Sequence, residues 1–288
     1  MTDKPAIIVI SSHVVRGTVG NRAAAFALEV LGYPVWCIPT VTLPWHPGHG
    51  PAHRIVAPDN QFATLLDDVS GSAWLGEVGA VLSGYLGSAT QVGCVGKLVS
   101  AVKARNPDAL YALDPVIGDG GSLYVPEEQA IALRDDLLPR ADLVTPNQFE
   151  LAWLARKAQA ADQSQVAELA KALGTPMVLA TSAPAMMRGM IGNMLLHDGK
   201  AYAAEHRMIE GPPNGLGDLT AALMVAHLLG GTAPHTALQN TTSSVYEVMI
   251  ASARAGSDEL AVERNIRSLL QPSAPVQMRQ LHLPSNRD

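Results

Sequence analysis

Residues 211–223 read Gly-Pro-Pro-Asn-Gly-Leu-Gly-Asp-Leu-Thr-Ala-Ala-Leu, and they are the most informative stretch of the chain. Gly215 and Gly217 allow unusual backbone dihedral angles and close approach, and a pattern of helical period begins directly after them. The backbone N–H groups at such a helix start point outward and carry partial positive charge, so they favour a bound anion. The stretch therefore predicts a glycine loop that leads into a helix with an anion-binding start.

Asp218 lies in the first turn of this predicted helix. There its carboxylate could accept a proton from an attacking hydroxyl group while the helix start holds the charge that develops on a transferred phosphoryl group. Aspartate is also a frequent helix cap, and the motif is short. From these residues alone, both the catalytic role and the capping role of Asp218 stay open.

Elsewhere in the chain, short β-branched runs alternate with longer segments of helical period, as parallel strands joined by crossover helices do. The predicted strands are residues 6–10, 35–38, 80–82, 110–113, 143–144 and 177–180, with 190–196 and 201–204 as an antiparallel pair, and the clearest helices are residues 21–31, 218–229 and 237–255. The fold class is therefore α/β, with a mostly parallel central sheet flanked by helices. No linker or repeat interrupts the pattern, so we expect a single domain over residues 1–272 and a surface tail over residues 273–288.

Composition narrows the possible partners. The 288 residues are 48% hydrophobic and 16% charged, which suits a buried parallel sheet, and the net charge of −6 gives no basic field for nucleic acid or an anionic membrane. No run approaches the ~20 apolar residues of a membrane span, so we expect a cytoplasmic protein. Cys37 and Cys94 show no CxxC spacing, and we expect neither a disulfide framework nor a zinc site.

Two further segments follow predicted strands directly, where open α/β sheets bind their ligands. Asp114 begins Asp-Pro-Val-Ile-Gly-Asp-Gly-Gly after the strand at 110–113, where an acidic residue suits a magnesium-linked nucleotide or a tight turn. Asn147 and Glu150 follow the strand at 143–144 and are three residues apart across a helix start. They could face one point beyond the sheet or form a capping box, and the two roles are compatible.

The end of the first strand, residues 11–17, is where this architecture is expected to hold a small polar substrate. His13 there is more typical of a structural histidine, and we do not assign it as the base. Residues 93–98, Gly-Cys-Val-Gly-Lys-Leu, lack the spacing and the final Ser or Thr of a Walker A loop. A Gly-x-Gly-x-x-Gly motif after the first strand is also missing, which argues against a dinucleotide-binding protein.

Taken together, these segments resemble the pyridoxal kinases of the ribokinase-like superfamily over residues 7–251. The resemblance rests on Ser12-His13-Val14 with Gly17 and Gly20-Asn21, Ser83-Gly84-Tyr85, Asp114-Pro115-Val116, Thr145-Pro146-Asn147 with Glu150, and Gly215-Leu216-Gly217-Asp218. It implies a ribokinase-like three-layer sandwich and ATP-dependent phosphorylation of the 5′-hydroxymethyl group of pyridoxal. A homodimer, Mg²⁺ and K⁺ are further expectations from the family.

The resemblance also implies roles for individual residues. Asp218 would be the general base, and Gly215, Leu216 and Gly217 would form the anion hole. Asp114 and Glu150 would organise Mg²⁺ and its waters with Asn147 nearby, and Asp114, Asp119, Thr145, Thr181 and Ser182 would contact the nucleotide or its metal. Ser12 and Tyr85 would bind the substrate ring, by hydrogen bonding and aromatic contact respectively.

Residues 41–50 depart from the family pattern. They read Val-Thr-Leu-Pro-Trp-His-Pro-Gly-His-Gly. In the pyridoxal kinases that the chain resembles, the segment that covers the substrate usually has a sequence similar to VQFSNHTxYG. Pro47 replaces the threonine whose hydroxyl faces the vitamin, and Trp45 replaces a small amide and could fill the pocket or stack on the ring. A kinase for another hydroxymethyl heterocycle, such as hydroxymethylpyrimidine, therefore remains an alternative. A binder of pyridoxal phosphate or nucleotide without catalysis is a second one, although a binder has no need of the base Asp218.

Overall fold

The computed structural model describes residues 4–282. Within this range one ten-stranded sheet has the order β12 (Gln277–Leu281), β11 (Lys200–Arg207), β10 (Met190–His197), β9 (Met177–Pro184), β8 (Leu143–Val144), β5 (Leu110–Leu113), β4 (Val78–Ser83), β1 (Ala6–Val14), β2 (Val35–Leu43) and β3 (Ile55–Val56). The six strands from β9 to β2 are parallel, and the strands beyond them at both edges pair antiparallel. The carboxyl ends of β1, β4, β5, β8 and β9 therefore lie along the same edge of the sheet.

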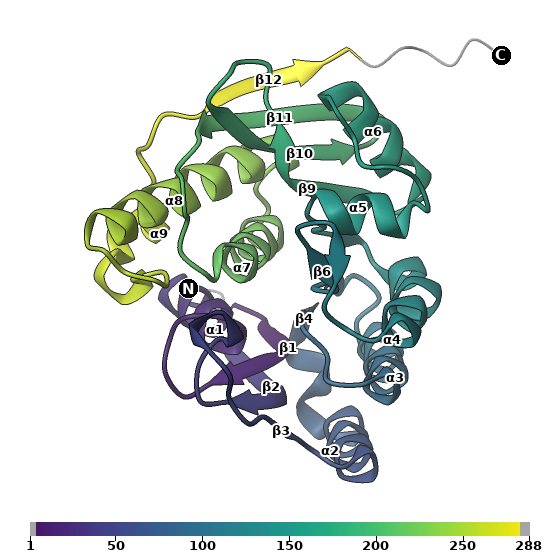
Figure 1. The fold of residues 1–288 in the computed structure, drawn as a ribbon. Helices are drawn as coiled ribbons and strands as arrows, with labels where there is room; N and C mark the ends of the chain where they lie inside the picture. Colours follow the sequence, from purple (N-terminus) through teal and green to yellow (C-terminus); the bar gives the residue numbers. More distant parts are fainter. Residues whose placement is uncertain (1–3, 283–288) are drawn as a thin grey trace, which may run out of the picture.

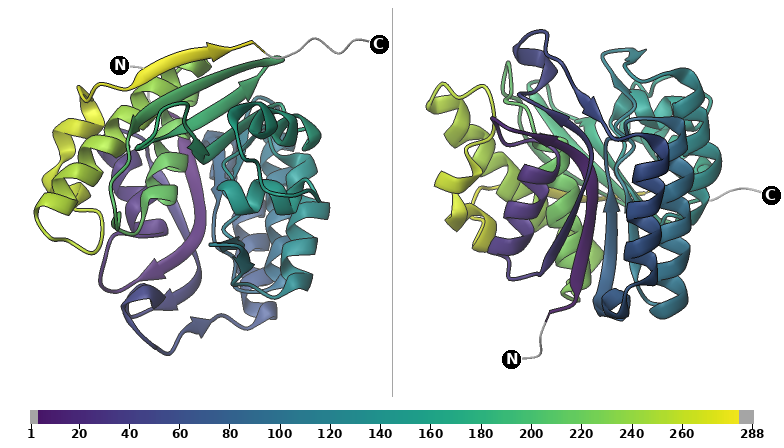
Figure 2. Two further views of the ribbon diagram at one scale, coloured as in Figure 1. Left: turned by 45° about the horizontal axis from the view of Figure 1, so that its top comes forward. Right: turned by 90° about the horizontal axis from the view of Figure 1, so that it is seen from below.

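Helices cover both faces of this sheet and make three layers (Figures 1 and 2). One face carries α2 (Asp59–Gly71), α3 (Ala89–Arg105), α4 (Glu127–Ala132), α5 (Gln148–Leu154) and α6 (Gln163–Ala172); the other carries α1 (Asn21–Val30), α7 (Leu216–Leu229) and α8 (Pro234–Arg254), with α9 (Ile266–Leu270) packed on α1 and α8. This arrangement confirms the predicted ribokinase-like three-layer α/β sandwich.

The alternation of side chains in β1 shows how the sequence produces two cores. Ile8 and Ile10 belong to the core under α2–α6, while Ile7 and Val9 belong to the core under α1, α7 and α8. Successive strand residues point to opposite faces, so a strand buried on both faces is apolar throughout. A continuous apolar run such as residues 6–10 is the expected result.

The strands and the hairpin agree with the predictions in position, but several elements are longer. The first strand extends to Val14 and the second to Leu43, because backbone pairing continues past the apolar run. The predicted antiparallel pair is β10 and β11, and its turn residues Asp198 and Gly199 have φ of 50° and 70°. Positive φ at both positions is what a tight two-residue hairpin turn requires.

The predicted surface tail over residues 273–288 is wrong for part of its length. Residues 277–281 form β12, which pairs with β11 along the sheet edge, and residues 283–288 lie outside the described range. Arg279 contacts the buried carboxylate of Glu205 at 2.5 Å, and this ion pair fixes the strand despite its weak hydrophobic pattern. No helix within residues 4–282 is long and apolar enough to cross a membrane.

Candidate active site

The glycine loop turns into α7 at Gly215, which is the N-cap of the helix and has φ of 97°. A Cβ atom at this position would lie 2.4 Å from the carbonyl oxygen of Thr18, so the loop after β1 passes too close for any side chain. Glycine at 215 therefore lets the loop after β1 and the start of α7 meet. The start of α7 lies beside the end of β9, where Leu216 and Gly217 line a cavity together with Thr181 and Ser182.

Asp218 is half-buried in the first turn of α7. Its carboxylate accepts hydrogen bonds from its own backbone N–H and from the backbone N–H of Gly20. The bond from Gly20 orients the carboxylate from another part of the chain, which a simple helix cap does not need. Burial raises the pKa of Asp218 to about 6, a value suited to a general base near neutral pH.

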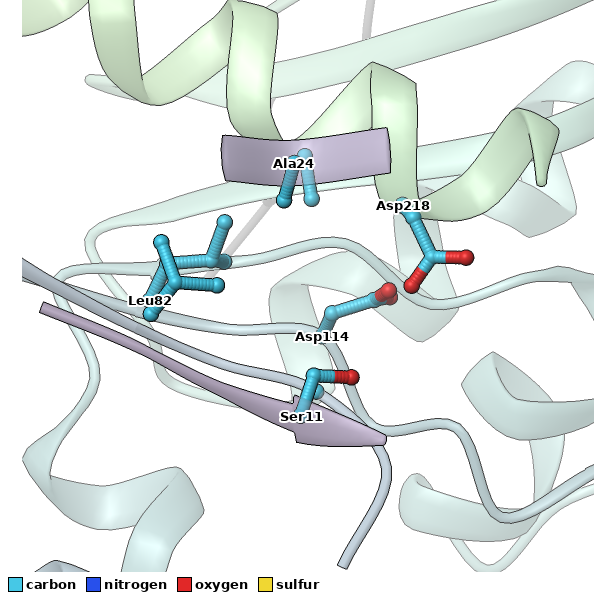
Figure 3. Close-up of a pocket in the computed structure, with 8 residues that line it drawn as sticks. Ser11, Ala24, Leu82, Asp114 and Asp218 are labelled. Carbon is cyan, nitrogen blue, oxygen red and sulfur yellow. The ribbon is translucent and has the colours of Figure 1, made fainter. Parts of the chain in front are cut away.

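Asp114 and Asp218 converge from opposite sides of a small cavity (Figure 3), with Ser11 beside them at the end of β1. Asp114 is buried after β5, and its Oδ1 accepts a hydrogen bond of 2.9 Å from Oγ1 of Thr145. Its Oδ2 lies 3.9 Å from where a Cβ on Gly217 would be. Burial, followed by repulsion from Glu150 and Asp218, raises the pKa of Asp114 well above its usual value.

Asn147 and Glu150 form a capping box at the start of α5, so the capping interpretation is confirmed. Oδ1 of Asn147 accepts from the N–H of Glu150 at 2.9 Å, and Oε2 of Glu150 accepts from the N–H of Asn147 at 2.9 Å. Oε1 of Glu150 also accepts from the N–H of Ile117 at 2.9 Å, in the segment after β5. Burial raises the pKa of Glu150 to about 7 in spite of these donors.

A small hairpin lies beside these acids. It consists of β6 (Gly118–Asp119) and β7 (Ser122–Leu123), and the amide of Asn147 donates to the carbonyl of Gly118 at 2.8 Å. Asp119 is exposed and accepts from the N–H of Gly120 at 2.7 Å. Tyr124 follows the hairpin; although the residue is 54% exposed, desolvation of its hydroxyl group and then Glu150, Asp114, Asp218 and Asp119 raise its pKa. No sequence motif points to Tyr124, which is recognisable only from this proximity.

A larger cavity of about 140 Å³ extends from the end of β9 to the start of α7. Thr181 and Ser182 line it, together with Leu216 and Gly217, so the structure brings these predicted residues to one pocket. Asn193 and His206 of the antiparallel hairpin and Met249 of α8 complete other walls. No sequence motif points to these three residues, which come together only through the packing of β10, β11 and α8.

On the other side of Asp218, the predicted ring-binding residues lie at the ends of β1 and β4. A Cβ on Gly20 would lie 2.5 Å from Oγ of Ser12, which brings Ser12 against the loop that donates to Asp218. The N–H of Tyr85 donates to Oγ of Ser11 at 3.2 Å, and the hydroxyl of Tyr85 accepts from Arg54 at 2.9 Å. Ser11 lies in the predicted substrate segment, residues 11–17, but no sequence motif assigned it an individual role; β1 has a register shift between Ser11 and His13.

Trp45 and Pro47 lie in the loop between β2 and β3, and both are exposed. Nε1 of Trp45 donates to the carbonyl of Gly50 at 3.3 Å, and Pro47 begins a single 3₁₀ turn, Pro47–His49. No hydrogen bond joins either residue to Asp218, Ser12 or Tyr85 within the described part of the chain. Their substrate-binding roles remain predictions.

Comparisons with known proteins agree with this architecture. The family described as phosphomethylpyrimidine kinase matches residues 58–263. The pyridoxal kinase PdxY of Leifsonia xyli subsp. xyli is 38% identical over 261 residues, which cover 88% of this chain and 92% of the relative. The pyridoxal kinase PdxY of Granulibacter bethesdensis is 35% identical over 276 residues, covering 93% and 96%.

Among solved structures, the pyridoxal kinase of Leishmania donovani in complex with ADP and pyridoxamine superposes with a TM-score of 0.90 at 30% identity, covering 96% of this chain and 100% of that one. The fold and the matches define the class as the ribokinase-like kinases of small molecules. This chain belongs to the phosphomethylpyrimidine kinase family and, within it, to the pyridoxal kinases.

Proposed function

We propose that this protein transfers the γ-phosphoryl group of ATP to the 5′-hydroxymethyl group of pyridoxal and so produces pyridoxal 5′-phosphate. The observation that carries the proposal is the half-buried carboxylate of Asp218, held by the N–H of Gly20 at the N-terminal turn of α7. The solved Leishmania donovani pyridoxal kinase is in complex with ADP and pyridoxamine. The relatives named above supply the substrate class, and Asp218 supplies the chemistry.

In the proposed reaction, the substrate hydroxyl gives its proton to Asp218 as its oxygen forms a bond to the γ-phosphorus and the bond to the β-phosphate oxygen breaks. The N–H groups of Gly215, Leu216 and Gly217 would stabilise the charge on the phosphoryl oxygens, as helix starts do for bound anions. Thr181 and Ser182 would contact the nucleotide in the cavity they line. ADP leaves from that cavity, and the phosphorylated vitamin leaves from the side of Ser12 and Tyr85.

Mg²⁺ and K⁺ are proposed as cofactors. Asp114 and Glu150 suit a hard cation, since repulsion between their carboxylates contributes to the raised pKa of Asp114. Asp114 has Oδ2 without a hydrogen-bond partner in the described chain, so it would be the direct ligand, and Glu150 would act through water. Both side-chain ends of Asn147 are engaged, which argues for a supporting role. Bound Mg²⁺ would neutralise phosphate charge.

The identity of the substrate is the part of the proposed function that an experiment tests best. Parallel assays of ADP release with pyridoxal, pyridoxine, pyridoxamine and hydroxymethylpyrimidine would give kcat/KM for each. We expect the B6 vitamers to be preferred, whereas a preference for the pyrimidine would support the alternative that residues 41–50 keep open. Binding of ATP and pyridoxal without ADP formation would indicate a non-catalytic homologue.

We propose that the protein has a single domain, lies in the cytoplasm and forms a homodimer. The expectation of a dimer comes from the family resemblance, and light scattering coupled to size exclusion would test it. A mass near 30.3 kDa, that of one chain, would contradict it. Replacing K⁺ with Na⁺ in the activity assay would test the monovalent ion.

A further inference from the structure

Four loops meet beside the start of α7, far apart in sequence. They follow β1 (residues 15–20), β2 (residues 44–54) and α8 (residues 255–261), and the fourth precedes α7 (residues 208–215). Hydrogen bonds and close packing connect all four around two acidic residues, Asp258 and Glu259. The mechanism above uses neither of these two residues.

His49, in the loop that carries Trp45 and Pro47, contacts both acids. Its Nε2 lies 2.7 Å from Oε1 of Glu259, and its Nδ1 lies 3.3 Å from Oδ2 of Asp258. Carboxylate oxygens only accept hydrogen bonds, so Nε2 of His49 is the donor in its contact with Glu259. His46 packs edge-on against His49 with ring centroids 6.0 Å apart, and Arg16 lies 3.5 Å from Asp258 on the outer side.

Glu259 is the centre of the cluster. It is 4% exposed, and its Oε2 accepts from the backbone N–H of Thr18 while its Oε1 faces His49. Any Cβ at Gly17 would collide with this carboxylate, so the backbone after β1 packs directly against Glu259. A buried carboxylate costs several kcal/mol when it lacks partners, which makes His49 and Thr18 strongly coupled to it.

From Glu259 the contacts lead to the catalytic residues along two backbone routes. Asn214 lies directly before the helix cap Gly215. Its backbone N–H donates to the carbonyl of Asp258 at 3.1 Å, and its carbonyl accepts from the N–H of Leu260 at 3.3 Å. Thr18 touches Gly215 through its carbonyl, and Gly20, two residues later, donates to Asp218. A shift of Glu259 would therefore move the backbone groups that position the anion hole and the base Asp218.

We propose that His49 and Glu259 form a positioning pair that holds the loop of Trp45 and Pro47 closed and fixes the anion hole and Asp218 relative to it. This inference rests on the proposed kinase function. Neither residue touches the reacting atoms; both act through Thr18, Gly20 and Asn214. The family pattern quoted above has tyrosine at the position of His49, so the pairing belongs to the altered substrate loop of this chain.

The test compares His49→Phe, which keeps a ring and loses both contacts, with Glu259→Gln, whose amide can still accept from Thr18 and donate to His49. His53→Gln is the matched control, because His53 is exposed in the same loop and has no partner in the described chain. We expect His49→Phe to raise KM for pyridoxal about tenfold and to lower kcat, with KM for ATP nearly unchanged. Glu259→Gln and the control should stay close to wild type.

Hydrogen exchange of residues 44–50 gives a readout independent of catalysis. We expect faster exchange there in His49→Phe and wild-type rates in the other two variants, because opening of this loop needs the pair to separate. A His49→Phe protein with unchanged kinetics and exchange, or with only a lower melting temperature, would overturn the proposal. If wild type does not phosphorylate pyridoxal, the proposed function fails separately, and unchanged exchange in His49→Phe would then reject the closed loop as well.

Discussion

Oγ1 of Thr145 donates a hydrogen bond of 2.9 Å to Oδ1 of Asp114, and it thereby joins the ends of the neighbouring strands β8 and β5. This bond fixes the Asp114 carboxylate with Oδ2 toward the start of α7. Asp114 is held in place although burial, and then repulsion from Glu150 and Asp218, raise the pKa of its carboxyl group. The site therefore has an electrostatic cost that a bound cation would relieve.

Asp114→Asn should remove this repulsion and stabilise the protein without ligands by about 1 kcal/mol, or about 2–4 °C in Tm, while abolishing most activity. A carboxyl whose pKa is raised on folding favours the folded state at low pH and loses that contribution as pH rises through the folded pKa. The gain should thus be larger at pH 8 than at pH 5. Thermal denaturation of Asp114→Asn measures this gain in Tm, with Asp108→Asn, at an exposed position before β5, as the control. A Tm of Asp114→Asn below that of wild type at pH 8 would count against the repulsion.

Glu150→Gln should raise the Mg²⁺ concentration needed for half-maximal rate severalfold, because an amide binds metal-bound water more weakly than a carboxylate. The amide nitrogen also cannot accept from the N–H of Asn147 or Ile117, so stability should fall. Magnesium titrations of the rate, with the exposed Glu128→Gln as control, measure the first effect. ADP formation without any divalent cation would remove the basis for this assignment.

The rate should depend on pH through Asp218. Burial raises the pKa of Asp218 to about 6, and a base acts only when ionised, so kcat/KM should fall as pH drops below about 6 and level off above about 7. A pH profile at saturating Mg²⁺ measures this acidic limb. A flat profile down to pH 5 would mean that another group accepts the proton.

Much of the fold could be predicted because strands buried on both faces are apolar runs. Residues 6–10, 110–113 and 177–180 fit this rule, and the Asp198-Gly199 turn identified the hairpin. β12 could not be found this way, since an edge strand is only partly buried and Arg279 holds it through Glu205. β3, only Ile55–Val56, was missed for a related reason: Ile55 is exposed and Val56 is only half-buried.

For the candidate site, local motifs identified residues whose neighbours are close in sequence. The capping box of Asn147 and Glu150 and the glycines before Asp218 are examples. Contacts made between distant segments left no such signal: the hydrogen bond from Gly20 to Asp218, the pairing of His49 with Glu259, and the walls that Asn193 and His206 give the larger cavity. These depend on how the loops pack at the sheet edge.

Pro47→Thr should lower KM for pyridoxal severalfold, since it restores a hydroxyl whose absence costs on the order of 1 kcal/mol in binding. Pro47 is exposed at the first position of its 3₁₀ turn, so the exchange should not disturb the core. Pro47→Val has the shape of threonine without the hydroxyl and separates the donor from loop stiffness. If both variants leave every vitamer unchanged or worse and wild type prefers another alcohol, pyridoxal is not the substrate.

The turnover of Asp218→Asn shows whether Asp218 is the general base. Asparagine keeps the size of the side chain and an oxygen that can accept from the N–H of Gly20, but it cannot take the substrate proton. We predict a fall in kcat for pyridoxal of about 10²-fold or more, with KM for ATP little changed. Near-normal turnover by a folded Asp218→Asn protein would show that the carboxylate only orders the start of α7, and it would contradict the account.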